Sequence, residues 1–212
     1  MITVVGGIKG GSGKTTLATN LCVIRSEQSK KILLVDADEQ KSASDWASQR
    51  HALGIETNWV TIQLAGKAIH TELRKMIGDY DDVIIDVGGR DTTSQRSALA
   101  IADICILPFK PKSFDMWTLG KVKTMITEIK AVNPDLKVYA VINQADSRGS
   151  DNKDSLDMIK EIEDFICLEC CLGNRKSFAN AAAEGLGVVE LKKSDPKAVE
   201  EMRTLYSQIY HT

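Results

Sequence analysis

The sequence lacks a long apolar run: no stretch approaches the roughly 20 residues that a membrane-spanning helix needs. Its first apolar run begins at Ile2, which leaves no room for the charged region, apolar core and cleavage site of a secretory signal. We therefore expect a cytoplasmic protein with no membrane partner. The five cysteines are expected to stay reduced, because an odd number in such a sequence does not indicate a disulfide framework.

Aromatic residues and an excess of one charge are also scarce. Aromatic side chains make up 5% of the 212 residues, which suits an aliphatic α/β core better than an aromatic-rich sandwich. The formal net charge is −2, so any contact with nucleic acid has to come from a local basic patch. No linker rich in proline, glycine or serine divides the chain, and no internal repeat is present. The expectation is a single domain over residues 1–212.

Short apolar runs alternate with helical patterns along the whole chain. The expected strands cover residues 2–5, 32–36, 59–64, 82–86, 104–108, 138–143 and 165–172. The expected helices cover residues 17–24, 41–53, 66–77, 92–102, 113–132, 156–162, 178–184 and 196–210. This alternation predicts an α/β fold of the P-loop type, a doubly wound and mainly parallel sheet with helices on both faces.

A glycine-rich stretch joins the first strand to the first helix. It reads Lys9-Gly10-Gly11-Ser12-Gly13-Lys14-Thr15-Thr16. Glycines let successive backbone N–H groups point at an anion, and the helix that follows adds its positive N-terminal end. Lys14 is placed to contact the β- and γ-phosphates of a nucleotide, and the Thr15 hydroxyl to ligate Mg²⁺. The alternative is a glycine-rich turn with no ligand.

One position departs from the general phosphate-binding pattern. The first glycine of G-x-x-x-x-G-K-[ST] would fall at Ile8, and the loop has a lysine, Lys9, at its start instead. In this it resembles the deviant Walker A loop of the ParA/MinD family of ATPases. The resemblance implies that residues 10–16 bind ATP, that ATP binding forms a homodimer, and that Lys9 reaches the nucleotide of the partner. Lys9 and Lys14 are then both catalytic.

Three carboxylates fall at the ends of expected strands, where ligands of doubly wound sheets bind. Asp36 and Asp38 lie in Asp36-Ala37-Asp38-Glu39-Gln40, which resembles the family element D-x-D-P-Q with Glu39 in place of proline. By that resemblance Asp36 helps to hold the water shell of Mg²⁺ and Asp38 orients the attacking water. Asp86 matches the Walker B position and is expected to contact Mg²⁺ through water. A solvated acidic loop is the alternative for Asp36 and Asp38.

The base specificity is predicted from the end of the strand over residues 138–143. In the ParA/MinD family an asparagine at the place of Asn143 reads the adenine ring. A guanine-binding N-K-x-D motif would need lysine at the next position, where Gln144 stands, so ATP is favoured over GTP. The alternative for Asn143 is a residue that simply ends the strand. Arg90, in the glycine-rich segment after Asp86, is assigned no catalytic role.

The C-terminal third suggests a DNA contact. The segment from Gly173 to Asn180 resembles the late arginine-containing helix start of ParA-type proteins, whose basic residues bind DNA without sequence preference. The candidates are Arg175, Lys176, Lys192 and Lys193, and the alternative is an ordinary solvated surface. The last helix is expected to pack on the core rather than to target a membrane as in MinD. Its polar side mixes both charges.

A cysteine cluster near the C-terminus, Cys167, Cys170 and Cys171, invites a metal interpretation. It lacks a fourth ligand and a second close pair, so buried strand thiols are expected.

Together these features indicate a short ParA-type partition ATPase of a plasmid or mobile element, using ATP and Mg²⁺. The resemblance implies slow hydrolysis stimulated by a centromere-binding partner protein, and association with the nucleoid in the ATP-bound form. Two alternatives stay open. One is a MinD-like or cargo-positioning switch that does not bind DNA. The other is an ATP-dependent enzyme of the dethiobiotin synthetase kind, which shares this fold.

Overall fold

The computed structural model describes residues 1–28, 30–111, 116–146, 151–193 and 195–210. Its centre is a seven-stranded sheet in the order β3-β2-β4-β1-β5-β6-β7, and every strand pair in it is parallel. The predicted doubly wound α/β fold is confirmed. The strands are β1 (Ile2–Val5), β2 (Ile32–Ala37), β3 (Trp59–Gln63), β4 (Asp82–Val87), β5 (Ile104–Phe109), β6 (Lys137–Ala145) and β7 (Ile166–Gly173).

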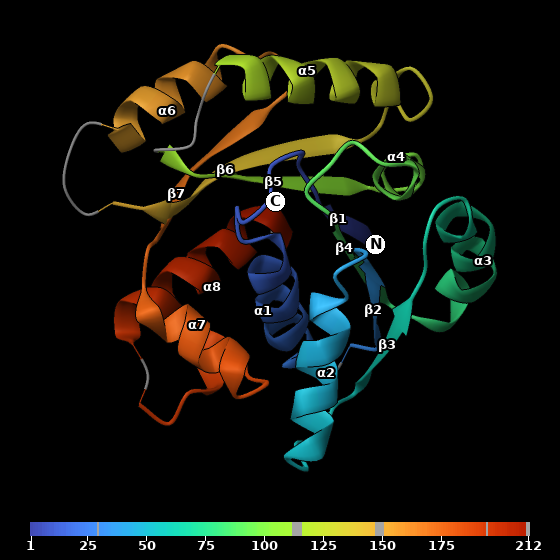
Figure 1. Ribbon diagram of the computed structural model, residues 1–212, viewed down its shortest axis with the longest axis vertical. Coiled ribbons are helices and arrows are strands. Elements are labelled where there is room, and N and C mark those ends of the chain that lie inside the picture. Colours follow the sequence, from blue (N-terminus) through green and yellow to red (C-terminus); the bar gives the residue numbers. More distant parts are fainter. Residues whose placement is uncertain (29, 112–115, 147–150, 194, 211–212) are drawn as a thin grey trace.

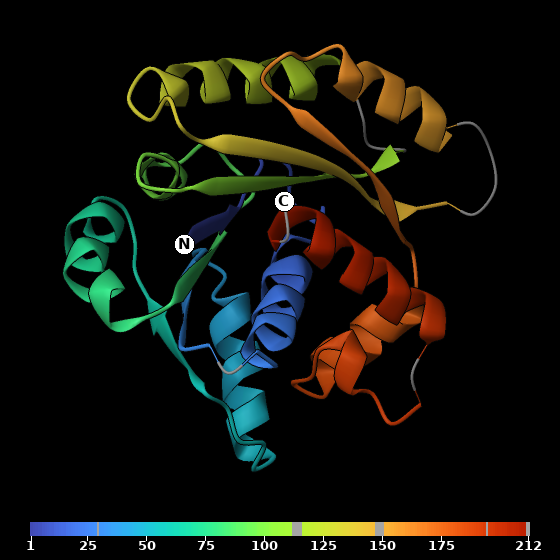
Figure 2. The ribbon, with the colours of Figure 1, turned by 180° about the vertical axis from the view of Figure 1, so that it is seen from behind.

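Helices cover both faces of this sheet (Figures 1 and 2). In the described part of the chain they are α1 (Lys14–Ser26), α2 (Ser42–Ala52), α3 (Ala68–Met76), α4 (Thr93–Leu99), α5 (Met116–Lys130), α6 (Asp151–Lys160), α7 (Lys176–Ala183) and α8 (Pro196–Tyr210). One face is covered by α3, α4, α5 and α6, and the other by α1, α2, α7 and α8. No helix among the described residues is both long and apolar enough to cross a bilayer.

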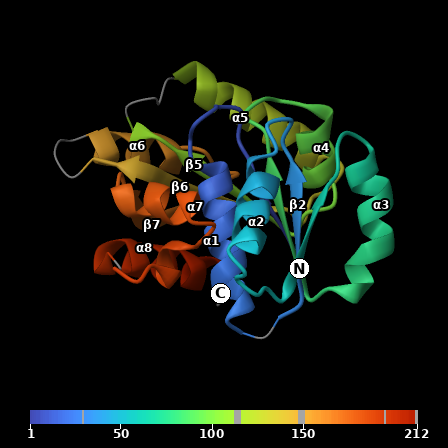
Figure 3. The same cartoon turned by 60° about the horizontal axis from the view of Figure 1, so that its bottom comes forward.

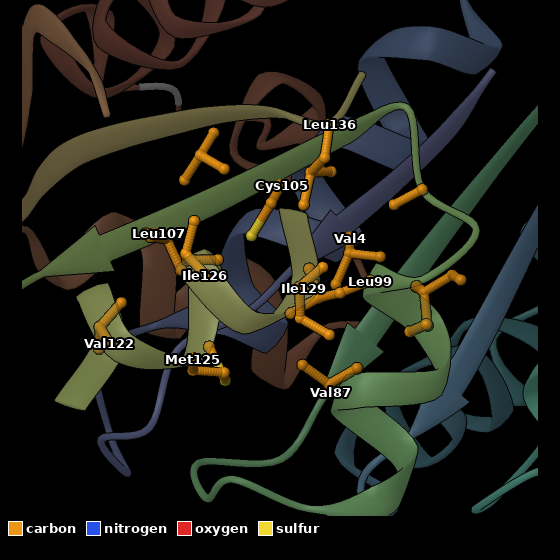
Figure 4. Close-up of a cluster of buried hydrophobic side chains, with 14 of the residues drawn as sticks. Val4, Val87, Leu99, Cys105, Leu107, Val122, Met125, Ile126, Ile129 and Leu136 are labelled. Atoms are coloured by element: carbon orange, nitrogen blue, oxygen red, sulfur yellow. The ribbon is translucent and has the colours of Figure 1, made fainter. Parts of the chain in front are cut away.

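Alternation along the strands produces two separate cores. Val4 of β1 faces the core under α5, whereas its neighbour Val5 faces α1 on the other side. The same alternation sends Leu33 and Val35 of β2 to the first core and Leu34 to the second. Figure 4 shows part of the first core, where side chains of α4 and α5 meet those of β1, β4 and β5. Central strands buried on both faces explain the continuous apolar runs in the sequence.

Local sequence sets the helix ends. The Thr92 hydroxyl caps α4 by accepting a hydrogen bond from the Gln95 backbone N–H at 3.2 Å. Gly185, the predicted end of α7, has φ +66°, and the backbone N–H of Leu186 donates to the Ala181 carbonyl at 2.8 Å. This is a Schellman ending, which requires the left-handed conformation that glycine adopts without strain.

Two expectations need correction. The strand over residues 104–108 was expected to stop at Pro108, but β5 continues through it to Phe109. Proline is tolerated there because Ile106 is the last residue of β5 paired with β1, so fewer ladder hydrogen bonds are at stake. The cysteines at 167, 170 and 171 are half-buried rather than buried, because β7 is an edge strand. Among the described residues no cluster suited to a metal is found.

The C-terminal helix behaves as expected. Its buried side carries Ala198, Met202, Leu205, Tyr206 and Ile209, which pack with α1 and the sheet. The prediction of a core-packing helix is confirmed.

Candidate nucleotide-binding site

An open cavity of about 1040 Å³ lies at the carboxyl edge of the sheet. Parallel strands bring their C-terminal ends to the same edge, so loops far apart in sequence meet there. In Figure 3 the N-terminal end of α1 and the turn after β2 lie at this edge. The cavity is lined by residues of the glycine-rich loop and α1 (Gly10, Gly11, Gly13, Lys14, Thr15, Thr16, Thr19), of the turn after β2 (Ala37, Asp38, Glu39, Gln40), of α2 (Ser42, Asp45, Trp46, Gln49), of the loop after β4 (Gly88, Gly89, Arg90, Thr92, Ser94), and by Gln144, Ala182 and Ala183.

The glycine-rich loop has the backbone that an anion-binding loop requires. Gly11 and Gly13 have φ values of +70° and +91°, and Gly13 directly precedes α1. A side chain at Gly13 would also collide with the amide group of Asn143, so only glycine fits there. The Lys14 ammonium donates to the Lys9 carbonyl at 3.0 Å, which closes the loop on itself.

Lys14 is the buried cation of this site. Its side chain is 6% exposed, and burial lowers its pKa, while the carboxylates of Asp86 and Asp38 oppose that shift. An ammonium that has lost much of its hydration gains strongly from a bound anion. The predicted role of Lys14 at the phosphates is consistent with this placement.

Asp36 and Asp86 lie opposite each other on β2 and β4. Both oxygens of Asp36 accept backbone hydrogen bonds, from Asp38 N at 3.2 Å and from Ser44 N at 2.7 Å. Asp36 thus fixes the turn that carries Asp38 and also the first turn of α2. Carboxylate oxygens can accept further hydrogen bonds, so these contacts leave room for a metal-bound water.

Asp86 is fully buried, and neither of its carboxylate oxygens has a hydrogen-bond partner among the residues that the structure describes. Burial raises its pKa to about 7; the nearby Thr15 hydroxyl and Lys14 lower the pKa, and Asp36 and Asp38 raise it. An unpartnered buried carboxylate is costly unless a cation or a metal-bound water meets it. Asp86, Asp36 and the Thr15 hydroxyl form an oxygen donor set of the kind that hydrated Mg²⁺ prefers, so these residues fit the ion.

This burial predicts a pH dependence of stability. Because the folded pKa of Asp86 lies above its usual value of 3.8, the ligand-free protein should lose stability as the pH rises from about 4 through about 7. Asp86→Asn should remove that part of the slope and raise the melting temperature at pH 8. Thermal unfolding at several pH values without nucleotide or Mg²⁺ checks this. Parallel curves for the two proteins would contradict the assigned environment of Asp86.

The loop after β4 touches both Asp38 and the phosphate-binding loop. A Cβ atom at Gly88 would lie 3.1 Å from Oδ1 of Asp38, and one at Gly89 would lie 2.7 Å from the Gly10 nitrogen. Asp38 itself is half-buried, and its Oδ1 accepts from the Gln40 N–H at 3.1 Å. The carboxylate that the resemblance assigns to the attacking water therefore lies where the two glycine-rich loops converge.

Helix α2, one wall of the cavity, is anchored by a residue that the sequence did not single out. Arg50 is 4% exposed, lies 4.8 Å from the ring centre of Trp59, and forms two hydrogen bonds of 2.7 and 2.6 Å with Glu190. Trp46 stacks on Trp59 and borders the cavity. This buried arginine, bound to Glu190 through both terminal nitrogens, holds α2 against the segment after α7.

Three side-chain amides also contact the loop or the residues just before it. Oε1 of Gln95, a fully buried residue of α4, accepts from the Gly7 N–H at 3.0 Å. Asn143 donates to the Ser12 carbonyl at 2.7 Å, and Gln144 to the Gly11 carbonyl at 3.1 Å. The adenine-reading role of Asn143 stays a prediction; the observed contact of its side chain is with the loop.

The DNA-contact candidates lie outside this site. The guanidinium of Arg175 is paired with Glu201, at 2.9 and 2.6 Å, and lies 3.8 Å from Asp195. Those carboxylates offset its charge, which leaves the exposed Lys176, Lys192 and Lys193 as the better candidates. Arg90 is exposed at the rim of the cavity.

Comparison with known proteins gives one family match and several similar folds. The family model described as the CobQ/CobB/MinD/ParA nucleotide binding domain matches residues 2–189. The chain is 25% identical over 213 residues to the maintenance of carboxysome distribution protein A of Halothiobacillus neapolitanus, covering 97% of this chain and 94% of that protein.

Two solved structures show the same fold. A plasmid partition protein from Borrelia burgdorferi superposes with a TM-score of 0.71 at 18% identity, covering 99% of this chain and 97% of that one. Cobyrinic acid a,c-diamide synthase from Mycobacterium smegmatis, with a bound ATP analogue and magnesium, gives 0.77 at 20% identity, covering 99% and 94%.

Proposed function

The chain belongs to the CobQ/CobB/MinD/ParA nucleotide-binding family, and from that premise we propose that it is a ParA-type ATPase that partitions a plasmid or mobile element. ATP joins two copies in a sandwich dimer, the dimer binds DNA without sequence preference, and a centromere-binding protein stimulates slow hydrolysis. Residues 1–212 act as one domain in the cytoplasm, associated with the nucleoid when ATP is bound. The observation that carries the ATPase part is the arrangement of Lys14, Thr15 and the unpartnered Asp86 around one glycine-rich loop.

Binding is assigned to the loop. Backbone N–H groups of residues 10–16 bind the phosphates, and Lys14 offsets the charge on the β- and γ-phosphates. Mg²⁺, when bound, neutralises charge that develops on the phosphates; Thr15 would hold it directly, and Asp36 and Asp86 through water. These assignments are supported by the buried, oxygen-rich end of β2 and β4.

Hydrolysis is assigned to Asp38. A carboxylate held by the Gln40 N–H, beside the loop after β4, is placed to orient a water for attack on the γ-phosphate. Gly89 already lies against Gly10 of the phosphate-binding loop, and Gly88 lies against the Asp38 side chain, so this segment would exclude other waters from the γ-phosphate.

A prediction separates the two lysines of the loop. Lys9→Ala should leave the ATP affinity of the monomer within about twofold and weaken ATP-dependent dimerisation about tenfold or more, because the resemblance assigns this ammonium to the partner's phosphates. Analytical ultracentrifugation with a nonhydrolysable analogue measures dimerisation, and Lys121→Ala, at an exposed position of α5, is the matched control. A normal dimer would contradict the role across the interface.

The cargo has a second candidate. The match over 97% of the chain to a carboxysome-distribution protein supports a positioning ATPase whose cargo is not a plasmid. The similarity in fold to a plasmid partition protein supports the first candidate. The similarity to a diamide synthase keeps an ATP-consuming enzyme as an outcome of the test.

A DNA-binding titration tests the proposed function. Nonspecific duplex DNA is titrated with protein in ADP, in ATP and in a nonhydrolysable analogue, and binding should require the triphosphate forms. Changing Lys176, Lys192 and Lys193 together to Gln should weaken binding about tenfold or more and reduce its salt dependence. If the protein binds DNA equally well with ADP and with ATP, or if it does not bind DNA at all, DNA partition is rejected. ATP turnover that needs a small carboxylate or amine would support the enzyme.

A further inference from the structure

Two consecutive residues at the end of β6 donate side-chain hydrogen bonds to two consecutive carbonyls of the phosphate-binding loop. The Asn143 amide donates to Ser12 O at 2.7 Å, and the Gln144 amide donates to Gly11 O at 3.1 Å. Asn143 is 6% exposed, and Gln144 is half-buried and borders the nucleotide cavity. In the sheet only β5 lies between β1 and β6, and this arrangement brings the end of β6 close to the loop that follows β1.

A bulge makes this double contact possible. Asn143 and Ala145 pair with Leu172 and Gly173 of β7, so β6 contains one extra residue, Gln144. In a regular strand neighbouring side chains point to opposite faces, whereas a bulge redirects one of them. Gln144 also has φ +57°, a left-handed conformation that a non-glycine residue keeps only where its surroundings require it.

The contacts fix the direction of the N–H groups of the loop. In a trans peptide the C=O and N–H bonds point in opposite directions, and the structure contains no cis peptide among its described residues. Holding the carbonyls of Gly11 and Ser12 on the β6 side therefore turns the N–H groups of Ser12 and Gly13 to the other side. Successive N–H groups aimed in this way form an anion-binding nest.

We propose that Gln144, with Asn143, is a positioning residue that preorganises the phosphate-binding loop for a polyphosphate chain rather than for a particular base. This inference rests on the proposed binding of a nucleotide at the loop. Gln144 occupies the position where a guanine-binding motif has lysine. In this protein the residue at that position acts on the main chain of the loop. Its signature is a loss of affinity that is the same whatever base is attached.

The test compares ligands that share phosphates and differ in the base. Gln144→Met keeps the length of the side chain and removes the amide donor. Isothermal titration calorimetry with ATP, GTP and inorganic triphosphate, each with Mg²⁺, should show affinities lowered by the same factor, about tenfold. In steady-state hydrolysis KM should rise more than kcat falls. Gln63→Met, an exposed glutamine of β3, is the matched control and should change nothing.

A second variant distinguishes a loss of affinity from a loss of folding. Gln144→Asn keeps a residue that tolerates positive φ and shortens the side chain, so it should lose affinity in the same pattern with an unchanged melting temperature. A loss confined to ATP would make the position a base reader and overturn the inference, as would unchanged affinity in both variants. Wild-type protein that binds none of the three ligands would overturn the proposed function itself, and the inference with it.

Discussion

Lys14→Ala is expected to reduce the affinity for Mg²⁺–ATP at least about 100-fold, the largest effect on binding in this protein. The ammonium is buried beside Asp86 and Asp38, and its only hydrogen bond in the described structure is to the Lys9 carbonyl. Bringing phosphates to it replaces that neutral acceptor by charged ones. A charge-assisted hydrogen bond contributes about 1.5–3 kcal/mol, and 1.4 kcal/mol corresponds to a factor of ten.

Folding and binding can be separated in this variant. Burial disfavours the Lys14 ammonium, so its removal should leave the melting temperature of the ligand-free protein unchanged or slightly higher. Calorimetric titration with ATP measures the affinity, and Lys121→Ala, an exposed lysine of α5, should bind as the wild type does. A folded Lys14→Ala protein with undiminished affinity would remove the proposed site.

The second large effect is on hydrolysis. Asp38→Ala should lower the rate of ATP hydrolysis by about 100-fold or more while ATP binding is retained, because a positioned carboxylate typically contributes that much to proton transfer or water orientation. The ATP-bound dimer should then accumulate. Phosphate release and size-exclusion chromatography with ATP follow the two consequences.

The neighbour of Asp38 provides the control. Glu39 is exposed, lines the same cavity and carries the same charge, but no resemblance gives it a role in hydrolysis. Glu39→Ala should keep most of the activity. If Asp38→Ala hydrolyses ATP at the wild-type rate, or if both variants lose activity equally, Asp38 is not the residue that orients the water.

The fold was predictable because its signals are local. Residues 32–35 and 83–85 are apolar on both faces because β2 and β4 lie inside a sheet that is covered on both sides. The phosphate-binding loop was equally visible, because its glycines, lysines and threonines are contiguous and lie between a strand and a helix. Strand ends were harder to predict. β5 can continue through Pro108 because its pairing with β1 ends at Ile106, and the sequence alone does not show which strands are neighbours in the sheet.

The residues that support the phosphate-binding loop were not predictable, because their contacts also depend on how distant elements pack together. Gln95 and Gln144 meet the loop only because α4 and β6 fold beside it, about 90 and 130 residues along the chain. The positive φ of Gln144 has no signature in a glutamine side chain. Arg175 was chosen as a DNA contact from its charge and from the resemblance of its segment to a helix start of ParA-type proteins, and its partner Glu201 lies 26 residues further on, in α8. Residue type identified the chemical groups, but not the groups that they face.

The central claim is that two copies of this chain share a triphosphate held by the glycine-rich loop. A crystal structure of Asp38→Ala grown with ATP and Mg²⁺ tests it most directly. We expect the phosphates to lie against the backbone of residues 10–16, with Lys9 of the partner subunit in contact with them. Mg²⁺ should be bound directly by the Thr15 hydroxyl and should contact Asp86 through one water molecule. ATP bound elsewhere, or a monomer with Lys9 turned away from any second nucleotide, would contradict it.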